Sequence, residues 1–266
     1  MEGSPSKTVP VVRIRGGAVE KADDAVAVET VVTFFVNGTE VATLLCSPGH
    51  IEALAVGFLA GEGVLSQPDQ IVSTDYDRGR GIVRVEVTDD VDLSPFSGER
   101  KGTFTSGCGK GQTYTFVRDA AGLPPLPPGP VLEAGVISRK MKAFIHRSET
   151  YQATGGVHSA LLWDGNGLDL FCEDLGRHNA VDKVFGRCLL EGIPAEGKIL
   201  LSSGRISSEI AIKCARHRIP IVISRNAPTS FSVHLAAALE LTLVGFVRGD
   251  RMNIYTAPER VRPAPG

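Results

Sequence analysis

Residues 198–247 read KILLSSGRISSEIAIKCARHRIPIVISRNAPTSFSVHLAAALELTLVGFV. This stretch alternates short apolar runs with longer segments that have the length of helices. Strands alternating with helices in this way predict an α/β fold, with a parallel or mixed sheet that helices cover on both faces. The expected strands are residues 198–202, 219–224 and 241–247, and the expected helices are residues 207–218 and 229–239.

Turn signals organise the rest of the chain. Asn37-Gly38 separates two β-rich segments, which is a strong hairpin signal because both residues tolerate a positive φ. Ser47-Pro48 is expected to open a helix, with the Ser47 hydroxyl as the N-cap, and Gly61-Glu62-Gly63 to end it. Further strands are expected at 70–76, 81–87, 158–163, 168–171 and 252–256, and further helices at 132–146 and 174–190.

A proline-rich connector, residues 122–130, divides the chain into two predicted lobes, because such a segment is stiff and extended. The lobe before it, residues 25–121, is β-rich, and the lobe after it, residues 131–258, is α/β. Residues 1–24 lack periodicity and are expected to form a flexible tail, and residues 259–266 a second tail.

The composition excludes several classes of protein. The 266 residues carry a net charge of −2, which gives no overall field to attract nucleic acid or a membrane surface. The N-terminus does not resemble a secretory signal, and the longest apolar stretch, residues 234–247, is too short to span a bilayer. The five cysteines include no C-x-x-C pair, which argues against a disulfide framework or a cysteine-rich zinc site. We therefore expect a cytoplasmic protein without its own metal, nucleic-acid partner or membrane partner.

Cys108 is the candidate reactive thiol. It lies in the loop Ser106-Gly107-Cys108-Gly109-Lys110-Gly111, where the glycines allow close approach of a partner. Lys110 favours the thiolate, which is the nucleophilic form of a cysteine. The alternative interpretation is a cysteine that merely occupies an exposed loop.

Two loops that follow predicted strands are candidate anion sites. Gly204, Arg205 and Ser207 lie at the start of a predicted helix, where free N–H groups and the helix dipole favour phosphate. Arg225 follows the next strand in the same way. If the two strands are parallel neighbours, both loops lie at the same edge of the sheet. For Ser207, a helix N-cap is the competing interpretation.

Histidines elsewhere have simpler explanations. Around residues 173–179, structural pairing among the charged side chains is favoured over ligand binding. His158 beside a core strand is more typical of a hydrogen-bonded structural residue than of a metal ligand, and no zinc spacing joins it to Cys172 and His178.

Short motifs follow one another in a characteristic order along residues 25–258. They are VNG (36–38), AVGFLAGEG (55–63), SGCG (106–109), TGGVHSA (154–160), EDLGRHNAVDK (173–183), SGRISSE (203–209), SRNAPT (224–229) and GFVRG (245–249). Together they resemble the FdhD/NarQ family, the accessory sulfurtransferases of formate dehydrogenase.

The resemblance implies a three-layer α/β/α fold similar to that of cytidine deaminases, and a homodimer. It also implies a carrier that takes sulfur from a cysteine desulfurase as a persulfide on Cys108. The acceptor would be the molybdenum cofactor, bis(molybdopterin guanine dinucleotide), before it enters formate dehydrogenase or a related molybdenum or tungsten enzyme. The implied cofactor-binding segment, which would contact the guanine nucleotide part, is Phe246, Val247, Arg248, Gly249, Asp250, Arg251, Met252 and Asn253.

Two other functions compete with this one. Deaminases of the related fold need a glutamate two residues after a zinc ligand and a later P-C-x-x-C pair. Here Ser159-Ala160 follows His158 and no such pair occurs, which excludes deamination. The second alternative is a chaperone that binds the cofactor or the apo-enzyme without carrying sulfur. It gains weight because Gly111 occupies the position where many family members have a second loop cysteine.

Overall fold

A mixed six-stranded sheet forms the centre of the protein. The computed structural model describes residues 3–96 and 122–263, so Cys108 and its loop lie outside the described residues. The strand order is β13-β12-β11-β10-β8-β9, with β10, β11 and β12 parallel and the other pairs antiparallel. The mixed sheet predicted from residues 198–247 is therefore confirmed. The bounds are β8 (His158–Trp163), β9 (Asp169–Asp174), β10 (Ile199–Ser202), β11 (Ile221–Ser224), β12 (Thr242–Arg248) and β13 (Arg251–Ile254).

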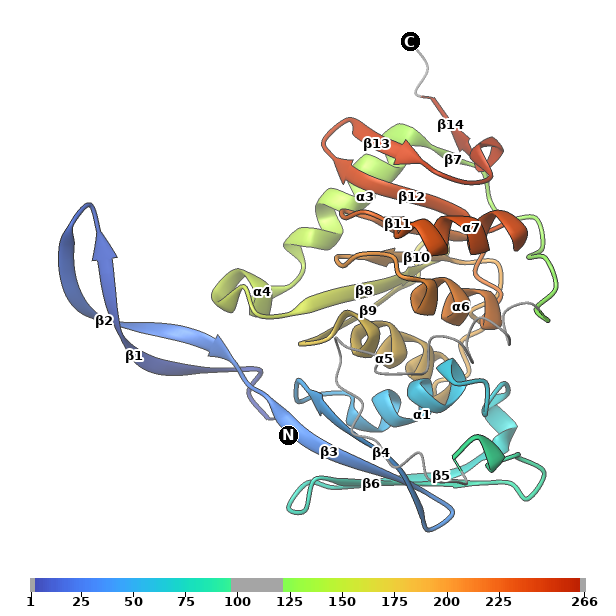
Figure 1. Ribbon diagram of the computed structural model, residues 1–266, viewed down its shortest axis with the longest axis horizontal. Helices are drawn as coiled ribbons and strands as arrows, with labels where there is room; N and C mark the ends of the chain where they lie inside the picture. The colour runs from blue at the N-terminus through green and yellow to red at the C-terminus, as the bar shows by residue number, and fades with distance from the viewer. Residues whose placement is uncertain (1–2, 97–121, 264–266) are drawn as a thin grey trace.

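Helices cover both faces of this sheet (Figure 1). Leu201 and Ile223 point to the face that packs against α3, whereas Leu200 and Val222 point to the opposite face, as the two-residue period of a strand requires. The opposite face is covered by α5, α6 and α7. The bounds are α3 (Ala134–His146), α5 (Arg177–Leu190), α6 (Ser208–Arg216) and α7 (Ser230–Ala238), with the short α4 (Glu149–Thr154) before β8.

The N-terminal lobe is a smaller sheet of order β4-β3-β6-β5, with α1 packed against it. The hairpin predicted at Asn37-Gly38 is confirmed, and the strands expected at 70–76 and 81–87 pair antiparallel with each other. The bounds are β3 (Thr30–Val36), β4 (Thr39–Cys46), α1 (Ile51–Gly61), β5 (Ile71–Asp77) and β6 (Ile82–Val87). The predicted start of α1 is wrong: the helix begins at Ile51, after His50 in a left-handed conformation (φ 50°). The Ser47 hydroxyl instead accepts a hydrogen bond from the backbone N–H of Leu175 at 3.1 Å.

Neither predicted tail is structureless where it is described. β1 (Ser6–Arg15) and β2 (Ala18–Ala27) pair along ten residues each and project from the body as a two-stranded ribbon (Figure 1). A tight turn at Gly16-Gly17, both with positive φ, permits the pairing. At the other end, β14 (Val261–Arg262) pairs with β7 (Leu132–Glu133) and buries Val261. Backbone pairing, which periodicity does not report, orders both segments. The helix predicted over residues 174–190 begins three residues later than expected. Asp174 ends β9, and α5 begins at Arg177.

The two lobes meet where α1 crosses α5, and glycines stand at the crossing. A Cβ atom added to Gly57 would lie 1.8 Å from the carbonyl oxygen of Asp182, and one added to Gly186 would lie 1.8 Å from that of Ala53. The backbones of the two helices are thus in direct contact. Only residues without a Cβ atom permit this separation, so both glycines fix the placement of one lobe on the other.

We expect Gly57→Ala to lower the free energy of unfolding by about 1–3 kcal/mol or more, because the added methyl group overpacks the helix crossing. Urea unfolding followed by circular dichroism measures the change. The control is Gly135→Ala in α3, where the nearest atom to the added Cβ would be Arg139 Nη1 at 3.4 Å. That substitution is expected to be neutral or stabilising. Equal losses in the two variants would contradict this account of the crossing.

Candidate functional site

The four cysteines in the described part of the chain are buried thiols. Cys46, Cys172, Cys188 and Cys214 are at most 3% exposed. Burial raises the pKa of Cys46 and of Cys188 to about 12 and that of Cys172 to about 11, and it also raises the pKa of Cys214. A protonated, inaccessible thiol is a poor nucleophile. None of these four side chains is therefore suited to exchange sulfur with a partner protein.

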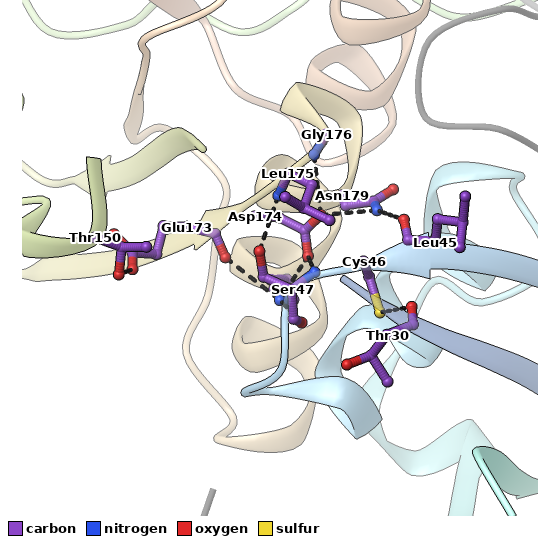
Figure 2. Close-up of polar contacts among 11 residues, drawn as sticks. Thr30, Leu45, Cys46, Ser47, Thr150, Glu173, Asp174, Leu175, Gly176 and Asn179 are labelled. Atoms are coloured by element: carbon purple, nitrogen blue, oxygen red, sulfur yellow. Dashed lines mark hydrogen bonds and ion pairs between the residues drawn. The ribbon is translucent and has the colours of Figure 1, made fainter. Parts of the chain in front are cut away.

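Asp174 of the C-terminal lobe, the acidic partner in a buried ion pair, contacts Ser47 of the N-terminal lobe next to Cys46 (Figure 2). Lys183 Nζ lies 2.6 Å from Asp174 Oδ2, and both side chains are almost fully buried. The Asp174 carboxylate also accepts hydrogen bonds from the N–H of Ser47 and of Gly176 and from the Asn179 amide, at 2.9–3.0 Å. These contacts connect the end of β4 to β9 and α5. The structural pairing favoured for residues 173–179 is confirmed for Asp174.

Two histidines near this junction also have structural partners. His158 Nδ1 lies 3.2 Å from the Ser203 hydroxyl, and His178 Nε2 lies 2.8 Å from Glu209 Oε2. Burial, reinforced by Arg177, lowers the pKa of His158. The hydrogen bond from His178 lowers the pKa of the Glu209 carboxyl. In residues 3–96 and 122–263 no group of three or more His, Cys, Asp or Glu side chains could hold a metal ion.

The two loops predicted to share an edge of the sheet do so, because β10 and β11 are parallel neighbours. They are also bonded to each other. The Ser224 hydroxyl donates to the carbonyl of Gly204 at 2.6 Å, and the Asn226 amide donates to the carbonyl of Ser203 at 2.6 Å. The loop that carries Arg205 is thereby fixed against the loop that carries Arg225.

The secondary candidates divide between these loops. The Ser207 hydroxyl accepts from the N–H of Ile210, so the N-cap interpretation is confirmed. Gly204 is buried beneath Arg177. A Cβ atom added to Gly204 would lie 2.8 Å from the Cβ atom of Arg177. Arg205 is exposed. Arg225 is different, because it lines a pocket of about 500 Å³ together with the turn between β12 and β13.

That turn supplies four of the predicted cofactor-binding residues to the pocket: Val247, Arg248, Gly249 and Asp250. A bulge in β12 positions them. Phe246 has φ 54°, unusual for a non-glycine residue, and its N–H donates to the carbonyl of Asn226 at 3.2 Å. The Arg248 guanidinium lies over the Phe246 ring, 5.9 Å from its centroid. Arg251, Met252 and Asn253 continue into β13 and do not line the pocket.

The opposite wall of the pocket is α3, which sequence reasoning did not include in the site. Ser138, Arg139, Met141, Lys142, Ile145 and His146 of this helix line it. The signal in the sequence is the recurrence of basic residues at 139, 142 and 146 in a predicted helix, a pattern that also suits a solvated helix face. The pocket therefore combines basic side chains with apolar ones, a lining whose chemistry suits an anion.

Comparison with known proteins agrees with this architecture. The FdhD/NarQ family matches residues 27–262 of the chain. The sulfur carrier protein FdhD of Staphylococcus haemolyticus is 38% identical over 252 residues, which cover 95% of both chains. The sulfur carrier protein FdhD of Bacillus subtilis is 39% identical over 252 residues, covering 94% of this chain and 95% of the relative.

A solved structure extends the likeness to the fold. The chain is similar to a putative formate dehydrogenase accessory protein from Desulfotalea psychrophila, with a TM-score of 0.80, 29% identity, and coverage of 97% of this chain and 100% of the other. The fold and the relatives thus define a mixed α/β protein of the accessory-protein class. The chain belongs to the FdhD/NarQ family. None of the helices in the described ranges has the length and hydropathy needed to cross a membrane.

The burial of four thiols predicts their reactivity. In the native protein at pH 8, iodoacetamide is expected to modify Cys108 rapidly and Cys46, Cys172, Cys188 and Cys214 only after unfolding. The raised pKa of the buried thiols keeps them protonated until well above pH 8. Peptide mass spectrometry locates the modification, and Cys108→Ser should remove the rapid phase. Rapid labelling of Cys172 or Cys214 in the folded protein would contradict the prediction.

Proposed function

We propose that this protein is a cytoplasmic sulfur carrier for formate dehydrogenase maturation. It accepts sulfur from a cysteine desulfurase as a persulfide on Cys108 and transfers it to bis(molybdopterin guanine dinucleotide) before the cofactor enters the enzyme. Membership of the family and the names of the relatives support the sulfur-transfer class. The observation that carries the assignment to Cys108 is the burial of the other four thiols.

The loading step conserves atoms and electrons. The Cys108 thiolate attacks the terminal sulfur of a persulfide on the desulfurase. The sulfur–sulfur bond of the donor breaks, the donor cysteine leaves as a thiolate, and Cys108 becomes the persulfide. Only one thiol is required to hold this sulfur, so Gly111 does not prevent the reaction.

The cofactor is the acceptor, and its guanine nucleotide end is assigned to the pocket between α3 and the turn after β12. Arg225 and Arg248 are donors that suit phosphate oxygens. Asp250 is an acceptor for the donor edge of guanine. Residues 247–250 of the proposed segment 246–253 line the pocket. We therefore favour them as the cofactor contacts over Arg251, Met252 and Asn253.

Further parts of the proposal rest on the family resemblance. They are a homodimer and a three-layer α/β/α fold similar to that of cytidine deaminases. The exposed Val12, Ile14 and Val19 of the β1–β2 ribbon are apolar side chains that a second copy would cover.

The second candidate function is a chaperone that binds the cofactor without carrying sulfur. The cation-lined pocket supports it as well as it supports the carrier, so detection of sulfur on Cys108 is the measurement that separates the two.

Incubation with a cysteine desulfurase and cysteine should add the mass of one sulfur atom to the intact protein and place it on Cys108. Cys108→Ser should abolish the addition and the activation of formate dehydrogenase while leaving the thermal unfolding midpoint unchanged. A labile mass increase that survives in Cys108→Ser would reject Cys108 as the carrier. Activation by Cys108→Ser would favour the chaperone.

GDP is expected to bind the protein, and Arg248→Ala should weaken its binding by about 1.5–3 kcal/mol, the range for hydrogen bonds to charged groups. Isothermal calorimetry at fixed salt measures the affinity. Arg251→Ala is the matched control, because this arginine begins β13 directly after the turn and does not line the pocket. A larger loss in Arg251→Ala than in Arg248→Ala would move the nucleotide to the other side of the hairpin.

A further inference from the structure

The loop between β10 and α6, residues 203–207, is in contact with basic side chains from other parts of the chain. The ring of His158, at the start of β8, has its Nδ1 atom 3.2 Å from the Ser203 hydroxyl. The ring of His178, near the start of α5, has its Nε2 atom 3.0 Å from the Ser207 hydroxyl. Two histidines from separate elements therefore meet one loop at the edge of the central sheet.

Two arginines join the histidines at this loop. Arg205 lies within it and is exposed. Arg177, the first residue of α5, packs over the backbone of Gly204, so that a Cβ atom added to Gly204 would lie 2.9 Å from the Cδ atom of Arg177. Burial lowers the pKa of Arg177, and the nearby charge of Arg205 lowers it further. Both guanidinium groups nevertheless stay protonated at neutral pH, so the loop holds two like charges close together.

The two arginines lack acceptors that would balance their charges. Within the described ranges, neither Arg177 nor Arg205 is part of an ion pair. The Nε atom of Arg177 is buried and has no hydrogen-bond partner among the described residues. The Glu209 carboxylate is close enough to act on the charge of Arg177, but it is bonded to His178 at 2.8 Å. A buried donor left without an acceptor costs free energy, and a bound anion would supply that acceptor.

The backbone of the loop is already committed to other partners. The carbonyl of Ser203 accepts from the Asn226 amide, and that of Gly204 accepts from the Ser224 hydroxyl, both at 2.6 Å. These bonds hold the loop against its neighbour and use carbonyl oxygens that could otherwise face the arginines. Helix α5 adds to the positive potential, because its N-cap residue, Gly176, has no side chain to accept from the first N–H groups.

The donors around the loop define the class of ligand. A guanidinium group binds an oxyanion through two parallel N–H···O bonds, and two such groups balance two negative charges. Burial and the charges of Arg177, His178 and Arg205 lower the pKa of His158, so its ring is neutral near pH 7 and adds no third charge. A compact oxyanion with two negative charges therefore matches the site.

We propose that Arg177 and Arg205 form a second anion site, separate from the pocket beside α3, that binds a compact oxyanion with two negative charges. Neither arginine lines that pocket. In a sulfur carrier of the kind proposed above, the oxyanion is the metal–oxo end of the cofactor, and this identity rests on the proposed function. A free inorganic oxyanion has the same chemistry, and the experiment separates the two sources.

The test is calorimetry at fixed ionic strength in chloride buffer, with molybdate and sulfate as probes. Wild-type protein should bind molybdate, and sulfate should compete with it. In the double variant Arg177→Gln, Arg205→Gln, the affinity for molybdate should fall by at least about tenfold, while the affinity for GDP stays within about twofold. Gly204→Ala should also weaken molybdate binding, because it keeps every charge but displaces the Arg177 side chain.

Arg187→Gln is the matched control, because this arginine belongs to the same helix but pairs with Glu191. Thermal unfolding verifies that each variant folds, and the exposed Arg205→Gln alone carries the test if Arg177 cannot be replaced. Unchanged molybdate affinity in the folded variants would overturn the inference. An absence of molybdate binding in the wild-type protein would do the same, as would an equal loss of GDP affinity, which would make the two sites one.

Activation of formate dehydrogenase identifies the source of the oxyanion. The double variant should load sulfur on Cys108 normally, whereas its activation of the enzyme should fall by at least about tenfold. Full activation by this variant would overturn the assignment to the metal end of the cofactor and leave a site for a free inorganic oxyanion. Failure of sulfur loading on wild-type Cys108 would instead reject the sulfur carrier and leave molybdate binding by the two arginines intact.

Discussion

The buried ion pair between Asp174 and Lys183 belongs to the C-terminal lobe, and its hydrogen bonds to Ser47 connect it to the N-terminal lobe. A carboxylate and an ammonium group removed from water are tolerated only when each is paired and its remaining hydrogen-bonding capacity is satisfied. Asp174 meets this condition with N–H donors from Ser47, Gly176 and Asn179, and Lys183 also donates to the carbonyl of Ser47 at 2.9 Å. Because Ser47 ends the N-terminal hairpin, the pair is complete only when the two lobes are docked.

The docking also explains the use of glycine in α5. Lys183 projects to the lobe junction from the same helix on which Gly186 touches the backbone of Ala53. A larger residue at 186 would push α1 outward and with it the strand that leads to Ser47. Close helix packing and the buried charges therefore meet at the same lobe junction. The opposite face of the central sheet, where α3 and the pocket lie, remains separate from this junction.

The separation gives the two faces different electrostatic characters. At the junction the charged side chains pair with one another, as Lys213 does with Asp182 at 2.5 Å in addition to Lys183 with Asp174. Around the pocket the described cations have no such partners. A net charge of −2 for the whole chain hides this local contrast. Unpaired cations around a cavity would attract an anion there, although the overall field of the molecule offers little attraction.

Sequence reasoning succeeded where a local pattern determines the local structure. The apolar runs at residues 198–202 and 219–224 predicted strands, and Asn37-Gly38 predicted a hairpin, because period and turn chemistry act over a few residues. It failed where a residue far away in the sequence determines the local structure. Ser47 was expected to cap a helix, yet its hydroxyl is bonded to Leu175, 128 residues away. The pairing of residues 6–27 rests on backbone hydrogen bonds that leave no trace in polarity. The contribution of α3 to the pocket depends on which face of the sheet the helix covers, and no motif within it records that.

The distribution of cysteines has a consequence for a carrier with a single loop thiol. A persulfide is lost when a second thiolate of the same protein attacks it, forming a disulfide and releasing the sulfur. Gly111 removes the nearest such thiol from the loop, and the core removes four others. Burial raises the pKa of the Cys46 thiol to about 12, so this thiol stays protonated at pH 8, and it is also inaccessible. In the proposed mechanism the sulfur on Cys108 therefore has no competing acceptor among the described cysteines, and it is retained until an external acceptor binds. With Gly111 in the loop in place of a second thiol, the loop favours retention of the sulfur during transfer.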